Sequence, residues 1–347
     1  MEITYGTKTI RNFAITSRTL DRDKYWNHLD TISRLCAENN FTGPLLLTGN
    51  DTYVEPWIAA QSAIDRYGVS PLVAVNPVYA HPFTVAKMVS SLAYLYGKNV
   101  FLNMVTGTSL SQHAALCDPL DHDEKYERLL EFTQIVQQLT EGSAAPVTFK
   151  GEHYSIEDLA LHPPIPKELL PEYFIAGHSE KAQFVKDQTG AVGMHMLSGK
   201  LDDIPEGVRG IHFGLITRER DDDAWDAAEE RYPEDARGQY VLEKSMKNTD
   251  SVWKKRLKFA ADTEDKSDNG YWLAPFRSFQ ADCPYFVGGH ERVKNLIVTL
   301  VRKGIKHIIL EVPETEEDFA EVSKAYALAE AELAKDFESA SAETVCG

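Results

Sequence analysis

The chain alternates short runs of apolar, often β-branched residues with longer segments in which apolar residues recur every three or four positions. The first pattern indicates buried strands and the second indicates amphipathic helices. A helix is predicted over Lys24 to Glu38, for example, because Trp26, Leu29, Ile32 and Leu35 fall on one face. Strands that alternate with helices in this way are typical of a parallel sheet wrapped by helices.

Eight strands are predicted, over residues 13–16, 43–48, 70–76, 99–106, 172–176, 193–197, 211–217 and 307–311. The helices predicted between and after them cover residues 24–38, 54–67, 81–95, 121–140, 179–188, a segment from 222, and 316–337. Eight strands in this order favour an α/β fold of the (β/α)8 TIM-barrel type over an open sheet. A dinucleotide-binding open sheet would carry a G-x-G-x-x-G turn and an NTPase a P-loop, and the sequence contains neither.

Three segments depart from the regular alternation. Val147–Phe149 and His153–Ile156 flank Lys150-Gly151-Glu152, which predicts a hairpin. Residues 198–209, between the sixth and seventh strands, are too few for a crossover helix, so this connection is predicted to be shortened. Residues 231–286 are predicted to be an insertion. Its polar part, Arg231 to Asn269, is predicted to be a helical insertion or a mobile lid, with an idle surface insertion as the alternative.

Length and composition support one barrel domain over residues 1–337, followed by a flexible tail, 338–347, rich in Ser, Ala and Glu. The formal net charge of -17 argues against a nucleic-acid or anionic-membrane partner, which would need a clustered basic face. No apolar run approaches the ~20 residues of a membrane helix, and the first residues lack a signal-peptide pattern, so a cytoplasmic protein is predicted. The four cysteines are scattered, which predicts neither disulfides nor a metal site.

Polar residues follow the fourth and fifth strands, where a TIM barrel places its site. The strand end from Asn103 to Thr108 offers main-chain donors and acceptors to a flat polar ring system. Tyr126, in the first turn of the next helix, can donate a hydrogen bond to a phosphate. Gly177-His178-Ser179 opens a helix whose free N–H groups favour an anion. Taken singly, these segments also fit a polar strand end, a core tyrosine and a helix cap.

Together these segments resemble the bacterial luciferase-like family of flavin-dependent monooxygenases, in the branch of the alkanesulfonate and nitrilotriacetate monooxygenases. The likeness extends from about Phe41 to Leu197. It is carried by Thr48-Gly49-Asn50, Asn76-Pro77 with His81-Pro82, Asn103 to Gly107, Asp121 to Glu127 with Glu131-Phe132-Thr133, Lys150 to Tyr154, and Gly177-His178-Ser179.

The resemblance implies a two-component enzyme. A separate flavin reductase would supply reduced FMN (FMNH2), which reacts with O2 to a C4a-peroxy or hydroperoxy flavin and oxygenates a small organic metabolite. It also implies a homodimer or higher homo-oligomer through early helices, and a strained non-proline cis peptide between Val75 and Asn76. The implied phosphate site is Tyr126, Gly177, His178 and Ser179, and the implied isoalloxazine site is Asn76, Asn103, Val105 and Thr106.

The residues that hold a sulfonate in this branch have different counterparts here. Asp51-Thr52-Tyr53 stands where the relatives have a cysteine, and Val312-Pro313 stands where they have a tyrosine. A buried sulfonate needs charge-assisted partners, so an alkanesulfonate substrate is not expected. The candidate catalytic residues are Arg277 and Thr52, by position, and His212 and His81, by their titration range. Both histidines also fit structural roles.

Two other functions stay open from the sequence. A deazaflavin (F420)-dependent oxidoreductase on the same barrel would transfer hydride without oxygen. A non-catalytic flavin-binding protein would fit the missing polar residues and the missing helix after the sixth strand. For a monooxygenase, a deep barrel mouth and a closing lid would keep water from the oxygenated cofactor.

Overall fold

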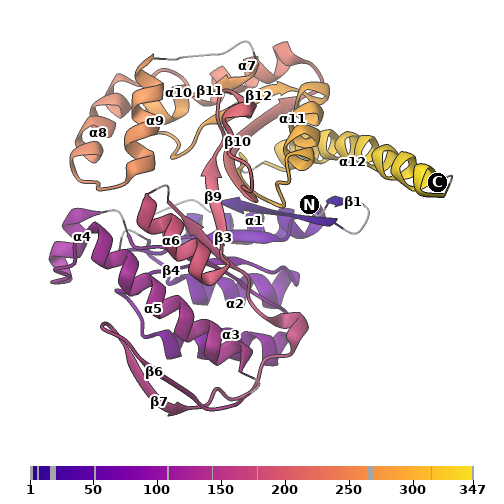
Figure 1. Ribbon diagram of the computed structural model, residues 1–347. Helices are drawn as coiled ribbons and strands as arrows, with labels where there is room; N and C mark the ends of the chain where they lie inside the picture. The colour runs from indigo at the N-terminus through magenta and orange to yellow at the C-terminus, as the bar shows by residue number, and fades with distance from the viewer. Residues whose placement is uncertain are drawn as a thin grey trace.

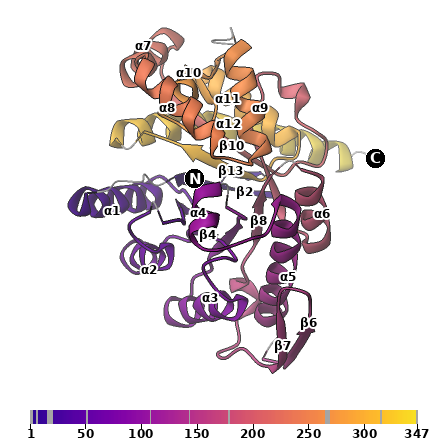
Figure 2. The same ribbon diagram turned by 90° about the vertical axis from the view of Figure 1, so that its left-hand side faces the viewer.

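The computed structural model describes residues 3–5, 8–15, 21–50, 52–107, 109–142, 144–177, 179–263, 269–313 and 315–345. Eight parallel strands close into a barrel, because β13 pairs with both β10 and β2. The predicted TIM barrel is confirmed (Figures 1 and 2), and each predicted strand has its counterpart. In order around the barrel these are β2 (Lys8–Ile15), β3 (Gly43–Leu46), β4 (Leu72–Val75), β5 (Phe101–Met104), β8 (Tyr173–Ala176), β9 (Val192–Met196), β10 (Gly210–Arg218) and β13 (His307–Glu311).

Helices surround the barrel on the outside (Figure 2). Their ends follow local signals: α2 and α3 begin with a proline and end at Gly68 and Gly97, both left-handed, while Asp121 and Glu124 form a capping box on α5. The outer helices are α1 (Arg22–Glu38), α2 (Pro56–Tyr67), α3 (Pro82–Tyr96), α5 (His122–Glu141), α6 (Glu180–Thr189), α7 (Asp221–Arg231), α11 (His290–Arg302) and α12 (Glu316–Val345).

The inside of the barrel is filled by side chains and is not a pore. The rings of Phe101 and Phe174 pack against Phe13 with centroids 5.2 and 5.9 Å away, both edge to face. Leu45, Leu72 and other apolar residues complete this buried layer. A ligand therefore has room at one end of the barrel and not through its axis.

The two predicted irregular connections are confirmed. Residues 198–209 contain a single 3-10 turn, η2 (Leu201–Asp203), in place of a helix. β6 (Val147–Lys150) and β7 (Ser155–Leu159) form the antiparallel hairpin. Both carboxylate oxygens of Glu131, on α5, accept N–H groups of the hairpin turn, from Glu152, His153 and Tyr154, at 2.7 to 3.0 Å.

The inserted region contains helices, as predicted. It holds α8 (Ala236–Lys247), α9 (Val252–Thr263), the short β11 (Tyr271–Trp272) and α10 (Ala274–Arg277). α8 and α9 lie side by side at the barrel end (Figure 1), joined by an ion pair between Lys258 and Glu243 at 2.9 Å. Whether they move as a lid stays a prediction.

Several elements were not predicted from the sequence. β12 (Tyr285–Gly289) runs parallel to the outer half of β10, and α11 follows it. β1 (Ile3–Tyr5) pairs with the start of β2, and α4 (Leu110–Ala115) follows β5. α12 continues to Val345 and not only to about Phe337. No helix in the described part of the chain is long and apolar enough to span a membrane.

Candidate active site

A cavity of about 900 Å³ opens at the carboxyl ends of the barrel strands, above the packed aromatic layer. Residues after β3, β4, β5, β8 and β13 line it, together with Met194 to Met196 on β9 and His212 on β10. Residues 248–254, which connect α8 to α9 and begin α9, form another part of its wall. Most of the barrel therefore contributes to one site, as the fold predicts.

Three hydroxyl groups meet in one corner of the cavity. The phenol of Tyr126 forms hydrogen bonds with the side chains of Thr106 and Ser179. Burial raises the pKa of Tyr126, which keeps the phenol protonated and able to donate. Ser179 is the N-cap of α6 and accepts the N–H of Ala182 at 3.1 Å. Hydroxyls at a helix N-terminus are suited to an anionic group.

Gly177 lies against this corner in a conformation that favours glycine, with φ of +139°. A β-carbon at this position would lie 2.5 Å from the Tyr126 hydroxyl oxygen. The Gly177 carbonyl accepts a hydrogen bond from the Lys186 ammonium at 3.2 Å. Lys186 is buried, and burial lowers its pKa. The ammonium group of Lys186 therefore contacts the backbone of Gly177, which borders the hydroxyl corner. His178 lies outside the described residues.

Two amide side chains lie along the neighbouring wall. The Asn103 side-chain oxygen is buried without a hydrogen-bond partner in the described part of the chain. Asn76 is 5 % exposed, and its oxygen accepts the N–H of Val78 at 3.1 Å. A β-carbon on Gly107 would lie 2.8 Å from the Asn76 amide nitrogen. This wall therefore offers amide groups and a closely approaching backbone to a flat ligand.

The expected cis peptide between Val75 and Asn76 is wrong. The bond is trans, and the cis bond in the described residues is His162–Pro163. In the trans form the carbonyls of Val75 and Asn76 accept the N–H groups of Val105 and Tyr79, at 2.9 and 3.0 Å. A non-proline cis bond costs about 3 kcal/mol, and nothing in this backbone offsets that cost.

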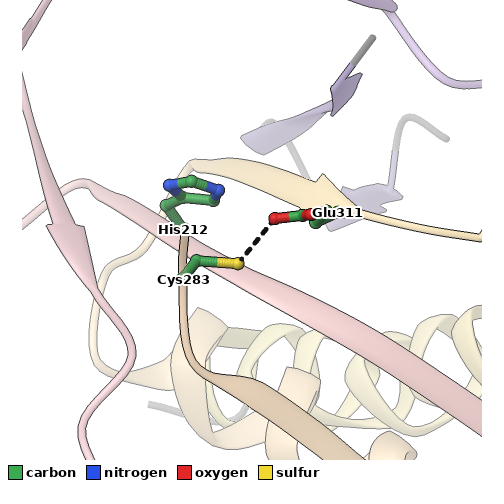
Figure 3. Close-up of side chains that lie close together, drawn as sticks. All are labelled: His212, Cys283 and Glu311. Atoms are coloured by element: carbon green, nitrogen blue, oxygen red, sulfur yellow. Dashed lines mark hydrogen bonds between the residues drawn. The ribbon is translucent and has the colours of Figure 1, made fainter. Parts of the chain in front are cut away.

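The opposite wall carries ionisable groups. His212 and Glu311 line the cavity, and the Cys283 thiol behind them donates to a Glu311 oxygen at 3.1 Å (Figure 3). Burial lowers the pKa of His212 to about 4 and raises the pKa of Glu311 to about 7. Near neutral pH the imidazole is therefore uncharged, and the carboxyl group holds its proton to a higher pH than an exposed glutamate does.

A family model described as luciferase-like monooxygenase matches residues 69–201, the segment that carries the amide wall and the hydroxyl corner. The 4-(gamma-L-glutamylamino)butanoyl-[BtrI acyl-carrier protein] monooxygenase BtrO of Niallia circulans is 30% identical over 292 residues, which are 79% of this chain and 83% of that protein. The chain belongs to the luciferase-like monooxygenase family. It is thus an enzyme of the flavin-dependent monooxygenase class, as the resemblance implied.

Solved structures show the same fold. Riboflavin lyase, crystallised with modified FMN and riboflavin, superposes with a TM-score of 0.67 at 16% identity and 92% coverage of both chains. An F420-dependent secondary alcohol dehydrogenase superposes with a TM-score of 0.59 at 13% identity, covering 92% of this chain and 99% of that chain. The luciferase-like barrel thus occurs with both kinds of cofactor.

The cavity brings together most of the residues expected from the sequence. Those that line it are Asn76, Asn103, Val105, Thr106, Tyr126, Gly177, Ser179 and His212. Three candidate catalytic residues lie outside its lining. His81 caps α3, its Nδ1 accepting the Phe83 N–H at 3.2 Å. Arg277 donates to the Ala261 carbonyl at 3.1 Å, and Thr52 lies in the loop before α2 with its hydroxyl buried. These positions do not favour a catalytic role for the three residues.

Sequence reasoning missed Lys186, His195, Cys283 and Glu311. Lys186 had a local signal, since it lies on the buried face of a predicted helix, where an ammonium group is rare. His195 lines the cavity from β9, and burial, with a smaller effect of the nearby Lys186, lowers its pKa to about 4. Cys283 and Glu311 become significant only through their mutual contact, which joins the segment before β12 to the end of β13.

Proposed function

We propose that this protein is the oxygenating component of a two-component monooxygenase. It takes FMNH2 from a separate flavin reductase and uses O2 to oxygenate a small organic metabolite. The observation that carries the proposal is the hydroxyl corner formed by Thr106, Tyr126 and Ser179 against Gly177. It has the donors, the space and the nearby Lys186 ammonium that the phosphate of FMN requires.

The residues present fit the cofactor. Tyr126 and Ser179 would donate to its phosphate, and the α6 N-terminus would add unpaired N–H groups. Asn103 and Asn76 would meet the polar edge of the isoalloxazine, where the unpartnered Asn103 oxygen can accept a ring N–H. Bound FMNH2 would supply the two electrons that reduce one atom of O2 to water while the other atom enters the substrate.

The chain's own contribution is to keep water away and to position the substrate. Ser245 of α8 and residues 248–254, which include Val252 and Trp253 at the start of α9, form part of the cavity wall and would help to shield it from water. His212 is uncharged at neutral pH because its pKa is about 4, so it can accept or donate one hydrogen bond without bringing charge to the cavity. Exclusion of water favours transfer of oxygen to the substrate over loss as hydrogen peroxide.

An acyl group carried as a thioester on an acyl carrier protein is the substrate class that we propose. The support is the similarity to the Niallia circulans monooxygenase, whose substrate is such a carrier-bound acyl group. The cavity lining in the described residues contains no arginine, and its lysine, Lys254, pairs with Asp282 at 3.2 Å. A free sulfonate would therefore lack the charged partner that it needs, whereas a neutral thioester does not require one.

Anaerobic titration of the protein with FMNH2, followed by mixing with O2, tests this proposal. We expect saturable binding of FMNH2, reoxidation that requires O2, and an oxygen atom from ¹⁸O2 in an acyl pantetheine thioester. The variant that combines Tyr126→Phe and Ser179→Ala should bind FMNH2 at least about tenfold more weakly, since each lost charge-assisted hydrogen bond contributes ~1.5–3 kcal/mol.

The same experiment separates the competing functions. Tight binding of reduced deazaflavin and oxygen-independent hydride transfer would replace the proposal with an F420-dependent oxidoreductase. FMN binding without incorporation of ¹⁸O into any thioester would favour a non-catalytic flavin-binding protein. Unchanged FMNH2 affinity in the double variant would contradict the proposal that the hydroxyl corner binds the FMN phosphate.

A further inference from the structure

Three potential metal ligands from distant parts of the sequence converge on the second wall of the cavity. His212 comes from β10, Cys283 from the segment just before β12, and Glu311 from the end of β13 (Figure 3). A ring nitrogen of His212, the Cys283 sulfur and a Glu311 carboxylate oxygen all lie within 4.8 Å of one another. The hydroxyl corner proposed for the flavin phosphate comes from α5 and the residues after β5 and β8, so it does not use this cluster.

We propose that His212, Cys283 and Glu311 form a binding site for a divalent transition-metal ion of the zinc class. Imidazole nitrogen, thiolate sulfur and carboxylate oxygen are the three ligand types that Zn²⁺ takes in proteins, and Fe²⁺ and Co²⁺ accept the same set. Three protein ligands leave a fourth position free, as in catalytic zinc sites. That position faces the cavity, because His212 and Glu311 both line it.

The binding capacity of these donors is largely unused. The Nε2 atom of His212 is buried and has no hydrogen-bond partner among the residues that the structure describes. A buried polar atom left unpaired costs about 1–3 kcal/mol, which a metal ion would remove by taking the nitrogen lone pair. Within the same described ranges Glu311 has no ion pair with a lysine or arginine, and its hydrogen-bond donor is the Cys283 thiol.

Charge balance favours a divalent ion. On binding, the S–H bond of Cys283 breaks and a protonated Glu311 loses its O–H proton; these protons leave to solvent, and the sulfur lone pair forms the metal–sulfur bond. One thiolate and one carboxylate then neutralise the two positive charges, while the imidazole stays neutral. A site with no net charge can remain in a buried wall without the penalty of an isolated ion.

The geometry requires only small side-chain movements. With metal–ligand distances of about 2.0–2.3 Å, the donors of a tetrahedral site lie roughly 3.5 Å apart. The donor atoms lie within 4.8 Å of one another, and the Cys283 sulfur is already 3.1 Å from a Glu311 oxygen. The separations therefore have to change by no more than about 1.3 Å, which rotation of the Glu311 and His212 side chains can supply. The cavity is the entry path for the ion. A bound ion would hold an oxygen or nitrogen atom of the substrate on the wall opposite the flavin corner.

Cobalt is the probe that tests the site, because thiolate-bound Co²⁺ absorbs in the near ultraviolet and tetrahedral Co²⁺ absorbs in the visible. The full-length protein, without a polyhistidine tag, reduced and stripped of metal, is titrated with Co²⁺ and then with Zn²⁺. We expect saturation at one ion per chain, a thiolate-to-cobalt band, and loss of both signals on adding Zn²⁺.

The variants assign the ligands. Cys283→Ser should abolish the thiolate band, and Glu311→Gln and His212→Ala should each weaken Co²⁺ binding by at least about tenfold. Cys117→Ser, which removes an exposed thiol outside the cavity lining, is the control and should bind as the parent does. Circular dichroism verifies folding, and Zn²⁺ should raise the melting temperature of the parent but not of His212→Ala.

Absence of saturable binding, a thiolate band that survives Cys283→Ser, or a band lost in Cys117→Ser would overturn the proposal. If Cys283→Ser does not fold, the affinities of Glu311→Gln and His212→Ala decide. None of these readouts requires flavin or substrate, so the result does not depend on the proposed function.

Discussion

The α-carbon of Gly177 faces the phenol of Tyr126 so closely that a β-carbon would lie 2.5 Å from the hydroxyl oxygen. This contact gives a direct test of the hydroxyl corner as the binding site of the FMN phosphate. Gly177→Ala should displace the Tyr126 hydroxyl and weaken FMNH2 binding at least about tenfold, because the displaced hydroxyl can no longer donate to the phosphate with good geometry. The free energy of unfolding should change less, because the Tyr126 side chain can shift to relieve the contact. Anaerobic fluorescence titration measures the affinity.

Gly190→Ala is a matched control for this variant. Gly190 also has a positive φ, of +66°, but a β-carbon there would meet nothing within 4 Å. The substitution should cost about 1 kcal/mol of stability through backbone strain alone and leave FMNH2 affinity unchanged. Equal loss of affinity in both variants would mean that backbone strain, and not the Tyr126 contact, controls binding.

The pH dependence of stability should change in Glu311→Gln. Burial raises the pKa of Glu311 from 4.5 to about 7, so between these pH values the folded state holds a proton that the unfolded state has released. The contribution of Glu311 to the free energy of unfolding is therefore fully present below pH ~4.5. It is lost as the pH rises through about 7, by up to about 3 kcal/mol. In metal-free protein, denaturant unfolding at pH 5 and pH 8 should show a larger decrease for the parent than for Glu311→Gln. Parallel profiles would contradict a buried Glu311 carboxyl.

His212 should act in the opposite direction. Burial lowers its pKa from 6.5 to about 4, so the unfolded state binds a proton first as the pH falls. Stability from this group is complete above pH ~6.5 and is lost as pH falls towards 4. His212→Gln should therefore reduce the loss of stability between pH 7 and pH 4.5, measured by urea unfolding. A parent and variant that lose the same stability over this range would show that His212 is accessible to protons.

Glu131 should be a structural residue of the hairpin between β6 and β7. It accepts three backbone N–H groups at 2.7 to 3.0 Å, and a β-carbon on Gly151 would collide with its carboxylate. Glu131→Ala should lower the free energy of unfolding by about 1–3 kcal/mol, because three donors lose their acceptor. Hydrogen exchange should localise the change to residues 150–154, with FMNH2 affinity retained. Glu141→Ala, at the end of the same helix, is the control.

The homodimer expected from the sequence stays a prediction, and the surface of α2 and α3 offers a place for it. Ile58, Tyr94 and Leu95 are 62, 74 and 63 % exposed, which is unusual for apolar side chains on neighbouring helices. A variant with Ile58→Asp and Leu95→Asp should elute as a monomer in size-exclusion chromatography with light scattering. Phe184→Asp, which changes an exposed aromatic residue on α6, should leave the association state unchanged. A parent that is already monomeric would contradict the prediction.

The sequence predicted the barrel well because its strands and helices carry strong local patterns. Leu72 to Val75 is apolar on both faces of a strand, and Asp121 with Glu124 starts a helix by contacts within one turn. β12 was missed because Tyr285 to Gly289 is short and ends in two glycines, which resemble a loop. Its position is instead set by pairing with β10 across more than sixty residues.

The residues of the candidate site likewise fall into two groups, those placed by local structure and those placed only by the tertiary fold. Tyr126, Gly177 and Ser179 lie beside helix starts and strand ends, so their places follow from local structure. Glu311 and Cys283 lie 28 positions apart and share a hydrogen bond only because β13 and β12 both pair with β10. No local pattern could indicate that contact.

The two walls of the cavity come from successive parts of the chain: residues 76–179 build the hydroxyl corner and amide wall, and residues 212–311 build the ionisable wall. Substitutions after Met196 can thus change the substrate selectivity and leave the flavin affinity unchanged. A chimera joined in the helix-free connection between β9 and β10 would inherit its coenzyme from one parent and its selectivity from the other.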